Sequence, residues 1–456
     1  MMGLTQELAH FVVGTKFDDI PRDGIERAKR LILDCIGVSL AAANEPAVEI
    51  ASAFVQELGG NCQASVIGRG FRTSVLNAAL LNGVSAHALD FDDASQTMIG
   101  HPTAAILPAV LAVAEHREAS GEEVLVAYVV GVELATKLGV SVNPGHYARG
   151  WHATATLGTL GAVAAAAKLM RLDVDQIRHA FGVAASQASG LRQNFGTMTK
   201  PLHAGQASRN GVFAAALAAR GFTADPSILE NRFGFLNTLC NGFSEANQDE
   251  FIARLGTPFE LVTPGVSIKR YPSCHGTSYS IDALLELVEE GQIEPDDVAS
   301  IRCRIPRLIS QMLIYANPQS GLEGKFSLQF CLAAALVDRN VSLRHFTEPK
   351  IHDPRIRRVM DRIDVDISDE PGDYGEVSIT LHDGRMLERR VTEPKGSPGN
   401  PLTDNQVASK FIDCAGLAVS HELAYKIMAK IMELEKLDNL TELMAWIAKG
   451  PIKPGS

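Results

Sequence analysis

The segment ATATLGTLGAVAAAAK, residues 153–168, decides how this chain folds. Every residue before its final lysine is small or apolar. A helix without a polar face is usually buried, and its small side chains let neighbouring helices approach closely. We therefore expect this segment to form a buried helix at the centre of a helical body.

Helical patterns lie on both sides of this segment. Residues 25–36 carry apolar side chains at helical spacing, and His101 precedes a proline that suits the first turn of a helix. Residues 204–220 continue the helical pattern, and residues 402–449 resume it after a Pro/Gly-rich joint at residues 394–401. Both ends of the chain are therefore predicted to be helical.

The chain between these helical segments has strand patterns. Ile301, Cys303 and Ile305 alternate with Arg302, Arg304 and Pro306, as in a strand with one buried face. Residues 377–381 alternate in the same way before an Asp-Gly pair, which is a hairpin signal, and residues 386–391 return. Helical stretches near residues 281–289 and 327–337 separate these strands.

These patterns predict a mainly α fold. A large all-helical domain is built from residues 1–262 plus 400–456, and residues 263–399 form an inserted, smaller α/β lid domain. The chain has 456 residues, of which 46% are hydrophobic, so a large core is available.

Composition restricts the partners and the compartment. The formal net charge of −11 disfavours nucleic acid and anionic membranes as partners. The N-terminus lacks signal-peptide features, and glycines, hydroxyl residues or charges interrupt each apolar stretch, so no membrane span is expected. Seven scattered cysteines without CxxC spacing suggest reduced thiols in the cytoplasm, with no iron–sulfur cluster and no structural zinc.

An acidic loop, Asp90-Phe91-Asp92-Asp93, lies shortly before His101. Carboxylates this close repel one another, so at least one should keep a proton or pair with a base. Helix capping by Asp93 is the alternative interpretation. A calcium or magnesium loop is a third, although the spaced pattern of a calcium loop is absent.

His152 and Lys200 are each expected at the start of a helix. The helix dipole there disfavours a charged imidazole, and a neutral His152 could serve as a general base. A hydrogen-bonded core histidine is the alternative. Lys200 contradicts the usual charge preference, so it is either solvated or present for a negative ligand. Burial would lower its pKa and make it a candidate base.

Further polar residues cluster near the expected domain junction. Lys269 and Arg270 could hold carboxylates, whereas Cys274 has no acyl-transfer partners and is interpreted as a structural or lining thiol. Basic and acid–base groups at such joints suit proton abstraction next to a carboxylate. No dinucleotide motif, P-loop or nucleophile elbow is present, so no cofactor is expected.

Several of these stretches together resemble the MmgE/PrpD family, which contains 2-methylcitrate dehydratases, cis-aconitate decarboxylases and iminodisuccinate epimerase. The matching pieces, which cover nearly the whole chain, are LDFDDA (89–94), HPTAAILPAVLAVAE (101–115), GWHATATLGTLGAVAAAAK (150–168), NFGTMTKPLHAG (194–205), KRYPSC (269–274) and EGKFS (323–327). The resemblance implies an all-helical domain with a smaller α/β lid, a homodimer and no required metal.

The resemblance also assigns site residues, and it exposes differences. Positions that match the active site of the decarboxylase branch are Asp90, His101, His152, Lys200, Lys269 and Tyr315. A threonine of that branch is Ala94 here, and its lid histidines fall on Cys274 and Ser278, with His275 next to the first. These differences argue against cis-aconitate decarboxylation. The GHY…GWH and NFGTMTKP stretches resemble the epimerase branch most.

The resulting hypothesis is a metal-independent lyase or isomerase that abstracts a proton α to a carboxylate of a small di- or tricarboxylic acid, as a 2-methylcitrate dehydratase or an iminodisuccinate epimerase does. Lys200 and His152 form the acid–base pair, Asp90 and His101 orient them, and Tyr147 is a second base in an epimerase. The expected substrate-binding residues are Arg192, Lys269, Arg270, His275, Tyr315 and Lys325. The alternatives are a cis-aconitate decarboxylase-like enzyme and a non-catalytic dimer that binds a dicarboxylate.

Overall fold

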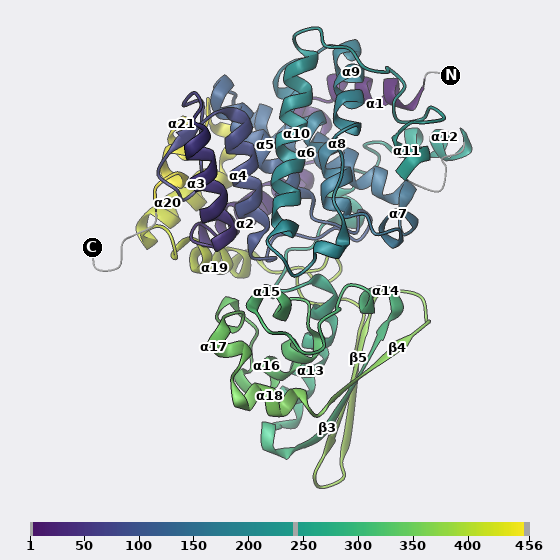
Figure 1. The fold of residues 1–456 in the computed structure, drawn as a ribbon, viewed down its shortest axis with the longest axis vertical. Coiled ribbons are helices and arrows are strands. Elements are labelled where there is room, and N and C mark those ends of the chain that lie inside the picture. Colours follow the sequence, from purple (N-terminus) through teal and green to yellow (C-terminus); the bar gives the residue numbers. More distant parts are fainter. Residues whose placement is uncertain (1–2, 240–244, 451–456) are drawn as a thin grey trace.

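The computed structural model describes residues 3–239 and 245–450 and has two bodies, one above the other in Figure 1. The upper, helical body contains most of the helices, and the lower, α/β body contains a four-stranded sheet. The longer helices of the upper body are α1 (Leu4–Gly14), α2 (Arg22–Ala41), α3 (Pro46–Leu58), α4 (Val75–Ala88), α5 (Pro102–Arg117), α6 (Gly121–Val142), α8 (Ala153–Leu169), α9 (Val174–Ala185), α10 (Thr199–Ala218), α12 (Glu245–Arg254), α19 (Asp404–Ala415) and α20 (His421–Met432). Shorter elements there are α7 (Gly145–Ala148), α11 (Phe235–Leu239), α21 (Thr441–Ile447), β1 (Ala64–Ser65) and β2 (Arg72–Thr73).

Helix α8 is the predicted buried helix, and the prediction is confirmed. All of its residues except Lys168 are buried, and it packs against α5, α6, α9 and α10. Its small residues are needed for this packing: a Cβ atom added to Gly161 would lie 2.6 Å from the carbonyl oxygen of Gly131 on α6. Close packing of this kind fixes the neighbouring helices, whose ends carry the polar residues described below.

A second close contact joins α4 to α10. A Cβ atom on Gly83 would lie 2.6 Å from the Cα atom of Gly205, and one on Gly205 would lie 2.3 Å from the carbonyl oxygen of Leu80. Glycine at both positions therefore allows the two backbones to touch. This contact sets the spacing between the end of α4, which leads into the acidic loop, and the start of α10, which carries Lys200.

The lower body has a mixed sheet with the strand order β4-β3-β5-β6. Strand β3 (Val298–Pro306) pairs in parallel with β4 (Ile363–Ser368) and antiparallel with β5 (Gly375–Leu381), which forms the predicted hairpin with β6 (Met386–Val391). Ile301, Cys303 and Ile305 are buried as expected. The helices of this body are α13 (Ser278–Gly291), α14 (Arg307–Ser310), α15 (Gly321–Gly324), α16 (Leu328–Asp338), α17 (Glu348–Ile351) and α18 (Pro354–Met360).

The C-terminal segment returns to the helical body, where α19 packs on α2 (Figure 1). On α19, Lys410 forms a buried ion pair of 2.7 Å with Asp34 of α2. The same ammonium donates hydrogen bonds to the carbonyl oxygens of Phe91, at 2.8 Å, and Lys269, at 2.9 Å. The C-terminal segment thus ties together two distant stretches that reach the site.

The mainly α fold is confirmed. Most buried hydrophobic residues of the two bodies form two different clusters, although Ile268, Cys274 and Phe326 join the cluster of the helical body. Residues 402–447 contribute to this same cluster. The domain limits of 1–262 plus 400–456 and 263–399, and the action of the smaller domain as a lid, stay predictions. Within these limits, residues 1–2, 240–244 and 451–456 lie outside the described part of the chain.

Helix α6 corrects the expectation that no segment could span a membrane. Among the described residues, α6 is long and apolar enough for a span, and the bent pair α2–α3 passes the same test jointly. The apolar window of α6 is 89% buried inside the protein. The core helix of a folded body has the same composition, so this apolar length is explained by packing.

Candidate active site

A cavity of about 220 Å³ lies between the two bodies. One side, which we call the helical wall, includes Asp90, Ala94, His101, Tyr147, His152, Phe195 and Lys200. The other side, which we call the α/β wall, includes Cys274, His275, Tyr279, Ile309, Met312, Phe326 and Asp373. The predicted acid–base residues are therefore brought together in one space of small-molecule size.

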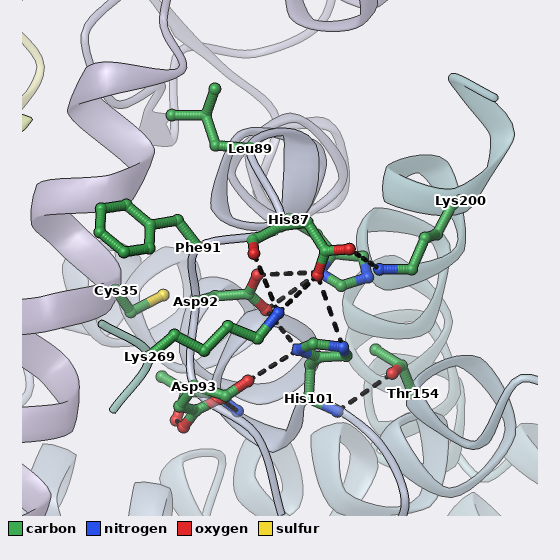
Figure 2. Close-up of polar contacts among 12 residues, drawn as sticks. Cys35, His87, Leu89, Phe91, Asp92, Asp93, His101, Thr154, Lys200 and Lys269 are labelled. Carbon is green, nitrogen blue, oxygen red and sulfur yellow. Dashed lines mark hydrogen bonds and ion pairs between the residues drawn. The ribbon is translucent and has the colours of Figure 1, made fainter. Parts of the chain in front are cut away.

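Asp90 is the centre of the charged part of the helical wall. It follows the end of α4 and has a left-handed backbone (φ 51°), a conformation that aspartate tolerates better than most residues. Its carboxylate is 2.9 Å from the ammonium of Lys200 and accepts a 2.6 Å hydrogen bond from Lys269. Figure 2 shows the two lysines reaching this loop from different elements.

These contacts keep Asp90 ionised. Burial alone would raise its pKa, but Lys200 and Lys269 hold the pKa of the carboxyl well below its usual range. The Lys200 ammonium also lies 5.4 Å from the ring centre of Phe195 and 5.1 Å from that of Phe326. A charged lysine is thus held at the cavity between a carboxylate and two aromatic rings.

Asp92 links two histidines behind Asp90. One carboxylate oxygen accepts a 2.9 Å hydrogen bond from Nδ1 of His87, and His101 Nδ1 lies 3.2 Å from the same oxygen. His101 Nδ1 also lies 2.7 Å from the carbonyl oxygen of Asp93, so this nitrogen carries the proton (Figure 2). The Nε2 atom of His101 is consequently left without a proton, 3.8 Å from Asp90, when the ring is neutral.

Burial affects the charge of these groups differently. It is the main reason why the pKa of His87 falls to about 4 and why that of His101 is also lowered. Burial also raises the pKa of Asp93 to about 8. The Asp93 carboxyl contacts the backbone amide and hydroxyl of Thr103 in the first turn of α5. Asp93 therefore satisfies a backbone amide of this helix, but it is buried, and the N-cap residue is His101.

His152 lies immediately before α8, as predicted, and contacts a second histidine. Its Nδ1 atom is 3.0 Å from Nδ1 of His203, and its backbone amide donates to the carbonyl oxygen of Gly190. Its Nε2 atom is buried and has no hydrogen-bond partner among the described residues. Burial, together with the nearby Lys200, holds the pKa of His152 well below its usual range. A neutral imidazole therefore borders the cavity.

Tyr147 borders the cavity and is supported by Arg192. The guanidinium lies 3.8 Å from the centre of the Tyr147 ring and donates a 2.8 Å hydrogen bond to the backbone oxygen of that residue. Burial raises the pKa of the Tyr147 hydroxyl. Arg192 therefore supports a residue of the cavity and is not itself part of the lining.

Of the remaining predicted substrate-binding residues, only His275 lines the cavity. Lys269 is buried beneath Asp90, and Lys325 donates to the carbonyl oxygens of Leu89 and Pro272. Arg270 lies 3.7 Å from Asp282, and the Tyr315 hydroxyl donates to the carbonyl oxygen of Phe195. Their predicted contact with substrate stays a prediction, and this geometry gives them supporting positions.

Two histidines of the site were not singled out from the sequence. His87 lies two residues before the LDFDDA stretch, and His203 lies inside the TKPLHAG stretch. Both stretches were already suspected, so the histidine beside the first and the one inside the second could have been included on chemical grounds. His87 has helical neighbours on α4, and helical periodicity alone does not distinguish a site residue from a core residue.

Four residues around Asp90 could in principle bind a metal ion. His87, Asp90, Asp92 and His101 offer ligand atoms that lie within 4.8 Å of one another. However, both oxygens of Asp90 already face ammonium groups, from Lys200 and Lys269. A divalent cation would have to share this carboxylate with two positive charges, so the donor set suits a metal poorly.

Sequence comparison agrees with this geometry. A family model described as the MmgE/PrpD N-terminal domain matches residues 6–247, and one described as the MmgE/PrpD C-terminal domain matches residues 271–434. The chain belongs to the MmgE/PrpD family. The family resemblance predicted from short motifs is therefore confirmed over both bodies.

Named relatives of this MmgE/PrpD chain are enzymes. It is 29% identical over 475 residues to the cis-aconitate decarboxylase of Homo sapiens, covering 100% of this chain and 96% of the relative. It is 28% identical to the cis-aconitate decarboxylase of Aspergillus terreus (strain NIH 2624 / FGSC A1156), covering 97% and 95%. The cis-aconitate decarboxylase-like protein oryM of Aspergillus oryzae is 29% identical, covering 98% and 97%. The prediction of an enzyme is supported at this coarse level.

Proposed function

We propose that this MmgE/PrpD chain moves a proton on the carbon next to a carboxylate of a small di- or tricarboxylic acid, without a metal. The observation that carries this proposal is that neutral His152, whose buried Nε2 atom has no hydrogen-bond partner among the described residues, lines the same cavity as the ammonium of Lys200. A neutral imidazole can accept a proton, and a nearby ammonium stabilises the negative charge that develops on the carboxylate.

Each residue of the helical wall then has a distinct role. His152 accepts or returns the α-proton, and Lys200 binds the carboxylate whose charge grows in the enolate-like transition state. Asp90 positions Lys200 through their 2.9 Å ion pair. His101, whose Nε2 atom is unprotonated in the neutral ring, is the second acid–base group, and Tyr147 is a further candidate for this role in an epimerase.

The proposed proton abstraction can lead to dehydration or to epimerisation, depending on what happens to the carbanion. Decarboxylation is the second candidate function. The relatives named as cis-aconitate decarboxylases favour decarboxylation. Ala94 and Cys274 argue against it, because both border the cavity and both replace residues that the resemblance assigns to the decarboxylase branch. A cavity altered at these positions should hold a different acid.

The experiment is an incubation of the enzyme with a panel of dicarboxylic and tricarboxylic acids in D₂O. Deuterium exchange with optical inversion supports an epimerase, and alkene formation without CO₂ supports a dehydratase. Release of CO₂ supports the decarboxylase. If an acid binds and raises the melting temperature but undergoes neither exchange nor conversion, the non-catalytic dicarboxylate-binding protein is correct.

We further propose a homodimer in the cytoplasm. Helix α3 exposes Ile50, Phe54 and Leu58 along one side, next to exposed Met198, which directly precedes α10, and Leu202 of α10. Apolar side chains gathered in this way are typical of a contact surface.

Analytical ultracentrifugation of the wild type and Phe54→Asp tests the dimer. A wild-type monomer, or a dimer that Phe54→Asp leaves unchanged, contradicts this surface. Subcellular fractionation tests the location.

A further inference from the structure

The contact between His152 and His203 imposes a rule on their protons. Their Nδ1 atoms are 3.0 Å apart, and the ring centres are 5.3 Å apart. A hydrogen bond between two imidazole nitrogens needs one donor and one acceptor. One Nδ1 atom therefore carries a proton and the other does not, so the tautomers of the two neutral rings are coupled.

The two histidines occupy different positions along a path out of the cavity. His152 is 1% exposed and borders the cavity, whereas His203 is 9% exposed and lies behind it on α10, close to Lys200 in sequence. Gly190, which accepts the His152 amide, lies against the His203 ring: a Cβ atom there would be 3.3 Å from its Nδ1. The pair is thus built in, and it runs from the cavity toward a less buried position.

Both rings favour the neutral state that such a pair requires. Burial, with His87 and Lys200 nearby, lowers the pKa of His203 to about 4. Burial also lowers the pKa of His152, which faces Lys200, His87 and His101 in addition to His203. An imidazolium that persisted on His152 would be unfavourable in these surroundings, so the other ring proton of His152 needs a route away when this residue takes a proton from substrate.

We propose that His203 is a relay residue that keeps His152 neutral by accepting its Nδ1 proton while the substrate-derived proton stays on Nε2. The inference rests on the proposed α-proton transfer. His152 Nε2 accepts the proton from the α-carbon, the Nδ1 proton of His152 passes to Nδ1 of His203, and His203 releases its Nε2 proton to water. Neither ring keeps a charge, and the protons balance. The reverse sequence turns His152 into an acid that protonates the carbanion.

Two substitutions separate a relay from simple packing. In His203→Asn, the amide can keep a hydrogen bond to Nδ1 of His152 but cannot pass a proton onward. In His203→Leu, both functions are lost. His179→Leu is the matched control, because His179 is a partly buried histidine of α9 whose Nδ1 contacts the carbonyl oxygen of Ala224 and which does not border the cavity.

The main readout is turnover together with the solvent isotope effect on kcat, measured in H₂O and D₂O. We expect His203→Asn and His203→Leu to lower kcat by about 10- to 100-fold with KM nearly unchanged, as for residues that support a catalytic group. Their solvent isotope effect should differ from that of the wild type, because the exchangeable ring protons that move in the relay no longer move in these variants. His179→Leu should match the wild type. A wild-type kcat and solvent isotope effect in His203→Asn overturn the relay.

A second measurement does not depend on turnover and so distinguishes failure of the relay from failure of the proposed function. Nitrogen-15 NMR of the histidine rings reports which nitrogen carries each proton. The relay requires complementary tautomers, one ring protonated at Nδ1 and the other at Nε2, and loss of this pairing in His203→Leu. Two rings that are both protonated at Nε2 overturn the relay even if exchange is observed.

Discussion

The two walls of the cavity differ in how their titratable groups are connected. In the helical wall, Asp90 is shared by Lys200 and Lys269, and His152 is paired with His203. In the α/β wall, neither ring nitrogen of His275 has a hydrogen-bond partner among the described residues, and burial lowers its pKa to about 3. The paired charges and coupled histidines thus belong to the helical wall, whereas the α/β wall, which holds the neutral His275 and one carboxyl group, Asp373, mainly shapes the space.

The largest expected effect tests this division directly. Lys200→Met removes the ammonium from the helical wall and should lower kcat by about 10²–10³-fold, the usual cost of losing one electrostatic group in a transition state. His275→Asn, in the α/β wall, should change KM more than kcat. Steady-state kinetics on the acid found in the exchange panel gives both numbers. Equal losses of kcat in the two variants would contradict the division.

The shared carboxylate gives the next prediction. Asp90→Asn leaves Lys200 and Lys269 buried without their counter-charge, which typically costs about 3–5 kcal/mol. We expect a marked fall in melting temperature as well as in kcat. Asp373→Asn, in the opposite wall, is the control and should have a small effect on stability. An unchanged melting temperature for Asp90→Asn would mean that the lysines do not depend on this carboxylate.

A smaller effect is expected from substituting the two cavity residues, Ala94 and Cys274, that differ from those of the decarboxylase branch. Cys274→His combined with Ala94→Thr changes one residue in each wall while leaving His152 and Lys200 in place. Changes in pocket contacts of this kind usually shift substrate preference by about 10- to 200-fold. The ratio of CO₂ release to α-exchange should rise. If the ratio stays constant, these positions do not decide the fate of the carbanion.

The smallest effect concerns stability and pH. The folded-state pKa of His203 is about 4, below the ordinary value of 6.5, so the unfolded chain binds more protons between these values. Its contribution to stability is present above pH 6.5 and is lost as the pH falls toward 4. The melting temperature of His203→Asn minus that of the wild type should therefore rise as the pH is lowered through this window.

Asp93→Asn is the control of opposite sign for this measurement. Burial raises the pKa of Asp93 to about 8, so the folded chain binds the extra proton and loses stability as the pH rises toward 8. The difference between Asp93→Asn and the wild type should grow as the pH is raised. The same trend for both variants would show that other groups dominate the pH dependence.

Much of this architecture could be predicted from residue patterns. The small-residue run of α8 indicated a buried helix, and the alternation of Ile301, Cys303 and Ile305 indicated a half-buried strand, because both patterns follow from the geometry of the backbone itself. Lys200 and His152 could be suspected because each was expected at the start of a helix, and Asp90 because it belongs to a run of close carboxylates.

The connections within the site could not be predicted in this way. The pairing of His152 with His203 depends on how α8 meets α10, and the sharing of Asp90 depends on a lysine that is 179 residues away in the chain. Arg270 and Lys325 were chosen for their charge, yet their side chains contact Asp282 and backbone carbonyls. Sequence patterns report the local element, whereas these contacts depend on long-range packing.

The clamp formed by Lys410 has a consequence for biosynthesis. Its ammonium joins Asp34 to the backbone of Phe91 and Lys269, three stretches that leave the ribosome at very different times. Domains tend to fold as they emerge, N-terminal parts first. The hydrogen bond from Lys410 to the acidic loop therefore cannot form until residue 410 has been translated. A chain released before that point would contain almost every residue of the site. It would lack the Lys410 contacts that hold these residues in their relative positions.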